Sequence, residues 1–130
     1  MLQNTKILVL EEEFLIAIDL QEMLEANGAT DLVFASTVNE AEALLQRGAG
    51  FDLAIAEARF GRPEIIALCA ALAHRGVAVV VTSADCETGR VFGDLPVIEK
   101  PFDERQLVAA CRLAMQRRIA LPARSGEALW

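Results

Sequence analysis

The chain has 130 residues, about the size of one domain, and a net charge of −7. The negative charge argues against a general nucleic-acid binder, whose affinity comes mainly from cations on phosphates, and against adhesion to an anionic membrane surface. Apolar residues make up 54% of the chain, so we expect a folded core rather than a disordered chain.

Targeting signals and cysteine chemistry are also not expected. The longest apolar run, residues 65–73, is about half of the roughly 18 residues that a membrane-spanning helix needs. The first ten residues carry one lysine and lead directly into a strand pattern, so we expect no signal peptide. The cysteines, Cys69, Cys86 and Cys111, are far apart, and His74 is the only histidine. A zinc site or a disulfide framework is therefore disfavoured, and we predict a cytoplasmic protein with free thiols.

Strand and helix patterns alternate along the chain. Lys6–Leu10 (KILVL) is typical of a buried strand, and it is followed by three glutamates and a helix pattern over residues 14–27. The later elements are expected in this order: a strand at 32–35, a helix at 37–46, a strand at 51–56, a helix at 63–73, a strand at 77–81, a strand at 96–98 and a helix from 103 to 119. Residues 85–94 fit either a short helix or an irregular loop.

Capping patterns support these helices. Thr37 with Glu40, and Asp103 with Gln106, have the spacing of a capping box, and Pro63 suits a first helical turn. Five strands that alternate with helices predict an α/β fold with a doubly wound, parallel five-stranded sheet and helices on both faces. We expect one domain over residues 1–121 and a tail over residues 122–130.

Polar residues follow the expected strands where each one ends. Glu11 and Glu12 follow the first strand, Glu57 the third, Thr82 the fourth and Lys100 the fifth. The carboxyl ends of parallel strands meet at one edge of the sheet, where ligands bind in open α/β folds. The first strand-to-helix loop has no Gly-x-Gly-x-x-Gly pattern and carries three negative charges, which disfavours nucleotide or FMN binding. Taken singly, these acids could also be solvated loop residues.

The stretches KILVLEEEFLI, FDLAIAEARF, VAVVVTSAD and VIEKPF, in this order and spacing, resemble the receiver domains of two-component response regulators. The resemblance covers residues 5–119. It implies a flavodoxin-like fold with strand order 2-1-3-4-5 and a histidine kinase or another signalling protein as partner. It also implies a role for each strand-end residue: Glu11 and Glu12 as the acidic pair that holds Mg²⁺, Glu57 as the phosphoryl acceptor, Thr82 as the pocket hydroxyl, and Lys100 followed by Pro101 as the pocket lysine and proline.

The chain departs from the receiver pattern at the centre of this site. The family's acceptor is aspartate, and Glu57 has one more methylene, which moves its carboxylate outward by about 1 Å, enough to disturb an attack geometry. Glu12 also stands where aspartate is usual, and Arg59 lies where the family supplies a backbone carbonyl to the metal. Mg²⁺ prefers near-ideal octahedral geometry, so we expect weak Mg²⁺ binding at best. Val97 replaces an aromatic switch residue, and the 18 residues from Thr82 to Lys100 form a short connection.

Three functions remain in competition at this point. In the favoured one the domain is a pseudo-receiver, not an enzyme, in which Glu57 mimics a phosphorylated acceptor by reaching toward Lys100 and Thr82. In the second the domain is still phosphorylated by a histidine kinase. In the third, which is disfavoured, Glu57 and Lys100 are the acid/base pair of a small enzyme. A homodimer through the last helix is a further hypothesis.

Overall fold

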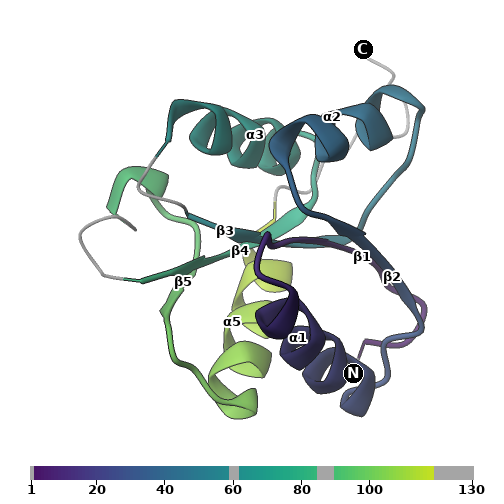
Figure 1. The fold of residues 1–130 in the computed structure, drawn as a ribbon, viewed down its shortest axis with the longest axis vertical. Helices are drawn as coiled ribbons and strands as arrows, with labels where there is room; N and C mark the ends of the chain where they lie inside the picture. The colour runs from purple at the N-terminus through teal and green to yellow at the C-terminus, as the bar shows by residue number, and fades with distance from the viewer. Residues whose placement is uncertain (1, 59–61, 85–89, 119–130) are drawn as a thin grey trace.

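The computed structural model of the chain describes residues 2–58, 62–84 and 90–118. Its centre is a sheet of five parallel strands in the order β2-β1-β3-β4-β5 (Figure 1), which confirms the predicted fold class and strand order. The strands are β1 (Lys6–Leu10), β2 (Asp31–Ala35), β3 (Leu53–Glu57), β4 (Ala78–Ser83) and β5 (Val97–Glu99).

Helices cover both faces of the sheet. They are α1 (Phe14–Ala26), α2 (Val38–Gln46), α3 (Pro63–His74) and α5 (Glu104–Arg117), with one 3₁₀ turn, η1 (Arg90–Phe92), between β4 and β5. In Figure 1, α1 and α5 lie below the sheet, and α2 and α3 lie above it. None of the helices in the described ranges is long and apolar enough to cross a membrane.

The side chains of the central strands divide between the two faces. On β3, Leu53 and Ile55 pack with α1 and α5, whereas Ala54 and Ala56 pack with α2 and α3. All four are buried, as expected for a central strand covered on both faces. This alternation gives the molecule two apolar layers, one on each side of the sheet.

The predicted helix starts are confirmed, with one difference in the capping contacts. The Asp103 carboxylate accepts from the Gln106 backbone N–H, and the Gln106 amide oxygen accepts from the Asp103 N–H, both at 2.8 Å. Thr37 Oγ1 likewise accepts from the Glu40 N–H at 3.1 Å. The Glu40 carboxylate, however, accepts from the backbone N–H of Ser36 at 2.8 Å, so the return bond is made one residue earlier than predicted.

Two strand boundaries differ from the prediction by two residues, and the other strand boundaries agree with it to within one residue. The third strand begins at Leu53 rather than residue 51, because Asp52 is engaged with the start of β1: its carboxylate accepts from the Lys6 N–H at 2.9 Å. The fourth strand continues to Ser83, because Thr82 and Ser83 pair with β5. The expected helix end at Ile119 and the expected tail, residues 122–130, lie outside the described residues. Only η1 is described within residues 85–94, together with the short link to β5.

Candidate functional site at the carboxyl end of the sheet

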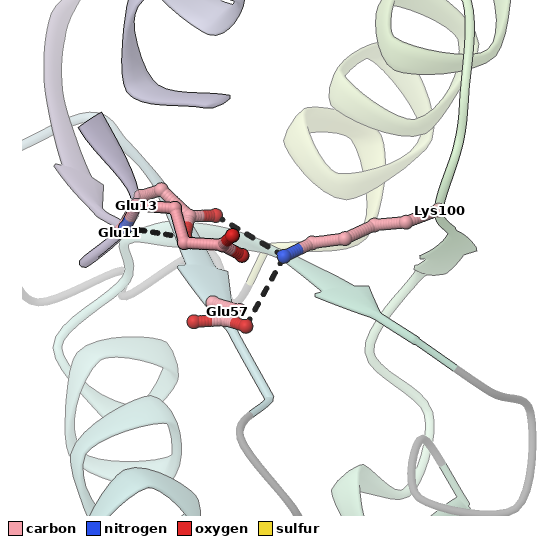
Figure 2. A network of polar contacts seen from close by, with 4 residues as sticks. All are labelled: Glu11, Glu13, Glu57 and Lys100. Carbon is pink, nitrogen blue, oxygen red and sulfur yellow. Dashed lines mark hydrogen bonds and ion pairs between the residues drawn. The ribbon is translucent and has the colours of Figure 1, made fainter. Parts of the chain in front are cut away.

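The parallel sheet brings three distant residues together at its carboxyl end. Glu11 follows β1, Glu57 is the last residue of β3, and Lys100 follows β5. β1 pairs directly with β3, which places the two glutamates on neighbouring strand ends. Lys100 lies on the other side of β4, and its long side chain crosses toward both carboxylates (Figure 2).

The Lys100 ammonium group bridges the two carboxylates. Its Nζ lies 3.1 Å from Glu57 Oε2 and 3.4 Å from Glu11 Oε1. The side chains are 16% exposed for Lys100, 14% for Glu57 and 1% for Glu11. Because little water reaches these groups, the contacts are screened less than those of a surface ion pair. The backbone holds the lysine in place as well, since the Lys100 N–H donates to the Ser83 carbonyl at 2.8 Å.

Glu11 is the most buried carboxylate of the site. Burial raises the pKa of its carboxyl group above the usual value, and the nearby negative charge of Glu57 raises that pKa further. The Glu13 backbone N–H, which donates to Glu11 Oε2 at 3.1 Å, and the Lys100 ammonium both favour the charged form and oppose that increase in pKa. Glu11 therefore depends on two donors to remain ionised in a nearly dry position.

A third carboxylate lies close to this pair. Carboxylate oxygens of Glu11, Glu13 and Glu57 lie within 4.8 Å of one another. Oxygen donors of this kind are the ligands that Mg²⁺ prefers, so the donor chemistry of the cluster fits that ion. The Lys100 ammonium, however, already contacts two of the three carboxylates, so a metal ion would have to compete with it. Glu13 is the member that the resemblance to receivers did not single out.

Glu12, predicted to pair with Glu11, lies outside this group of three. It is exposed and lines a cavity of about 230 Å³, together with Glu57, Arg62 and residues at the start of α2. Its role as a metal ligand stays a prediction. Three consecutive glutamates look equivalent in sequence, and only the turn from β1 into α1 determines which carboxylates face Glu57.

Thr82 lies beside Glu57 in the sheet register. Its side chain is buried, at 1% exposure for the residue, and its Oγ1 has no hydrogen-bond partner within the described part of the chain. A buried hydroxyl without a partner is uncommon, because an unmade hydrogen bond costs about 1–3 kcal/mol. This position therefore fits a polar group or water that would accept from the hydroxyl.

Two other predicted pocket residues, Pro101 and Arg59, have no described contact with the site. Pro101 follows Lys100 through a cis peptide bond and is exposed. Arg59, which stands where the receiver family supplies a backbone carbonyl to the metal, lies outside the described residues. The structure thus brings Glu11, Glu57, Thr82 and Lys100 to one end of the sheet as the sequence predicted, and adds Glu13.

Of three comparisons with known proteins, only the comparison with solved structures found similar proteins. No protein-family model matches the sequence, and no curated protein matches it. Among solved structures, a response regulator receiver protein from Sinorhizobium medicae WSM419 has a TM-score of 0.74 and 21% identity, over 92% of this chain and 100% of that chain.

Two further structures give the same result. The signal receiver domain of an HD domain-containing protein from Pseudomonas fluorescens Pf-5 has a TM-score of 0.73 and 21% identity, over 89% of this chain and 98% of that chain. A sensor protein from Polaromonas sp. JS666 has a TM-score of 0.72 and 24% identity, over 89% of this chain and 99% of that chain. These likenesses span nearly whole domains and confirm the predicted resemblance at the level of the backbone. The chain therefore has the flavodoxin-like fold of response regulator receiver domains.

Proposed function

We propose that this chain is a receiver-like signalling domain of a two-component phosphorelay that acts by protein–protein contact and needs no phosphoryl group. In this proposal Glu57 mimics a phosphorylated aspartate and holds the domain in one conformation. The observation that supports it most directly is the 3.1 Å contact between Lys100 Nζ and Glu57 Oε2. The domain would be cytoplasmic, and a histidine kinase or another signalling protein would be its partner.

The energy of this contact is of the right size for a conformational bias. A charge-assisted hydrogen bond between ammonium and carboxylate is stronger than a neutral one, and a partly exposed pair contributes on the order of 1 kcal/mol. Receiver-like domains that interconvert between two states need differ by only a few kcal/mol. The Lys100–Glu57 contact can therefore favour one state without dominating the stability of the fold.

The decisive experiment is incubation with acetyl phosphate and Mg²⁺, followed by intact-mass measurement. The parent chain should gain no phosphoryl group. The Glu57→Asp variant, whose carboxylate is drawn back by one methylene, should gain one, and Glu57→Gln is the matched control that cannot. Modification of the parent at Glu57 would favour a receiver that is still phosphorylated by a histidine kinase. An inert Glu57→Asp variant that binds Mg²⁺ normally would also contradict the mimic.

Magnesium binding should be weak in the parent chain. Glu11, Glu13 and Glu57 would hold the ion, which would supply the positive charge that phosphoryl transfer requires. Because the Lys100 ammonium already contacts two of these carboxylates, we expect a dissociation constant in the millimolar range or weaker. Calorimetric titration should show tighter binding for Lys100→Met than for the parent. A parent site in the tens of micromolar range would contradict this expectation.

A homodimer through α5 is the oligomeric state proposed here. α5 has an exposed Leu113 beside its buried face, and such a dimer would cover this side chain. Light scattering at increasing protein concentration tests it, and Leu113→Glu should weaken the association. A monomer at high concentration would exclude this dimer.

A further inference from the structure

The two most exposed large apolar side chains of the described structure are consecutive residues in the first turn of α1. Phe14 is 73% exposed and Leu15 is 75% exposed. The opposite face of the helix packs on the sheet through Leu20 and Leu24, which are buried. Phe14 and Leu15 therefore contribute little to the core. Large apolar side chains that lie together at the surface are typical of sites that contact other proteins.

A third exposed apolar side chain lies on the same side of the sheet. Phe34 is 41% exposed and belongs to β2, the edge strand beside β1 (Figure 1). In the sheet register it pairs with Val9, whose side chain belongs to the apolar layer under α1 and α5. Directly paired residues of neighbouring strands point to the same face, so Phe34 lies on the face that α1 covers. Three of the five exposed large apolar residues of the described structure are therefore on this side of the molecule.

The part of the chain that carries these side chains is acidic throughout. Residues 7–46, from β1 to the end of α2, hold nine acidic residues and no lysine or arginine. This stretch therefore has a charge of −9, compared with −7 for the whole chain. Of the nine acids only Glu11 is buried, and the Lys100 ammonium compensates its charge. The other eight are exposed, so the first half of the chain presents a negative surface without cations of its own.

Apolar and acidic residues share one face of α1. Leu15, Asp19 and Glu22 follow one another at spacings of four and three residues, so they lie in one stripe along the helix. All three are exposed, and Phe14 lies at the amino end of the stripe. We call these four residues the outer face of α1. An apolar patch followed by carboxylates is complementary to a partner whose apolar side chains lie beside lysines or arginines.

We propose that the outer face of α1 binds a basic amphipathic helix of a partner protein. Apolar side chains of that helix would contact Phe14 and Leu15, and its cations would pair with Asp19 and Glu22. A helix fits this face because its own apolar and charged residues recur at the same spacing. The negative charge would repel the phosphates of nucleic acids and anionic lipids, which favours a protein as the occupant. This inference deepens the proposed function, since it rests on contact with another protein and names the surface and the chemistry of that contact.

Fluorescence anisotropy with a dye-labelled synthetic peptide tests this surface. The probe is a helix of about four turns with leucines on one face and lysines beside them. Replacing both apolar residues, by Phe14→Ser with Leu15→Ser, should weaken binding about tenfold or more. Asp19→Lys with Glu22→Lys should have an effect of similar size. Added salt should weaken binding to the parent chain, because it screens the charged contacts.

Matched controls carry the same kinds of change outside residues 7–46. Val91→Ser replaces an apolar side chain that is 51% exposed on η1. Glu64→Lys with Asp94→Lys changes the net charge by the same amount as the α1 double variant, at two exposed positions on α3 and before β5. Both controls should change the affinity by less than about threefold, since they leave the outer face of α1 intact. Thermal unfolding confirms that each variant is folded.

Several outcomes would overturn the proposal. They are a parent chain that does not bind the leucine–lysine peptide, equal losses for the α1 variants and their controls, and equal binding of a serine–lysine peptide of the same charge. Light scattering that shows a parent dimer, dissociated by Phe14→Ser with Leu15→Ser, would assign this face to a second copy instead. Glu57 is unchanged in every variant and no acetyl phosphate is present. A failure here therefore leaves the test of the phosphoaspartate mimic intact, and modification of Glu57 in that test leaves this one intact.

Discussion

The two ends of the sheet differ in which side chains they hold and in how those side chains are stabilised. At the carboxyl end, Glu11, Glu57 and Lys100 are nearly shielded from water, and each charge is compensated by a neighbour. At the amino end of β4, a groove of about 880 Å³ between α3 and η1 is lined largely by apolar side chains, among them Cys69, Val79 and Phe92. A buried charge needs a partner of opposite sign, whereas an apolar surface needs only a cover. The stability of the fold should therefore fall when a single charged group is removed at the carboxyl end. It should change less when a single apolar side chain is replaced at the amino end.

The reactivity of two buried cysteines, one on each face of the sheet, should show the largest effect. Burial raises the pKa of both Cys69, which lines the groove, and Cys111, on the opposite face of the sheet, to about 12. Relative to the ordinary value of 9.0, their thiolate fraction near neutral pH should fall about 10³-fold. Labelling with a maleimide followed by peptide mass mapping should find both inert in the native chain and reactive in urea. Much faster labelling of Cys69 than of Cys111 would mean that the groove wall opens.

Removing the bridging lysine should give the largest loss of stability at the acidic end. Lys100→Met leaves two poorly solvated carboxylates facing each other, and we expect a loss of unfolding free energy on the order of 3 kcal/mol at neutral pH. Urea denaturation measures it. Lys6→Met is the matched control, because the Lys6 ammonium lies over the Phe51 ring at 5.4 Å, a contact that contributes about 0.5–1 kcal/mol at an exposed site. Equal losses for the two lysines would contradict the importance of the bridge.

Neutralising the acceptor-like glutamate should have a smaller effect. Glu57→Gln removes one carboxylate but leaves Lys100 in contact with Glu11, so the expected loss is about 1 kcal/mol or less. If Glu57 biases the conformation as proposed, binding to a partner should change more than the melting temperature does. Pull-down with candidate histidine kinases, alongside thermal denaturation, compares the two quantities. A large drop in melting temperature with unchanged binding would assign Glu57 a structural role.

The dependence of stability on pH should reveal the burial of Glu11. Its pKa is raised in the folded state, so the folded chain keeps the proton at pH values where the unfolded chain, with a pKa near 4.5, has lost it. Stability from this group is therefore greatest at low pH and falls as pH rises from the unfolded value through the raised folded value. Glu11→Gln should remove this fall in stability. The stability of the variant relative to the parent should therefore increase as pH rises.

Thermal denaturation of both proteins between about pH 4 and pH 7 measures this difference, which should be the smallest of the four. The variant should lie at or above the parent at neutral pH. A parent that is clearly more stable than Glu11→Gln at pH 7 would show that the contacts of Glu11 with Lys100 and with the Glu13 N–H outweigh the cost of burial.

The sequence by itself determined the architecture and most of the acidic site. Apolar runs such as Lys6–Leu10, alternating with helical patterns, predicted the parallel sheet, because strands buried on both faces must be apolar throughout. Once the strands were parallel, Glu11, Glu57, Thr82 and Lys100 had to meet at one end, since each lies at or next to the carboxyl end of a strand. Local capping contacts such as Asp103 with Gln106 were equally visible, because they join residues three apart.

Only the tertiary structure decided which groups meet in space. The three glutamates after β1 have the same chemistry, and the path of the turn into α1 places Glu13, rather than Glu12, with Glu11 and Glu57. The bridging position of Lys100 depends on a side chain that crosses β4 from a residue 89 positions away from Glu11 in the chain. The groove beside α3 depends on how far β5 extends along β4. Residue type and spacing specify which elements form, whereas these contacts depend on side-chain direction and on packing between elements that are distant in the chain.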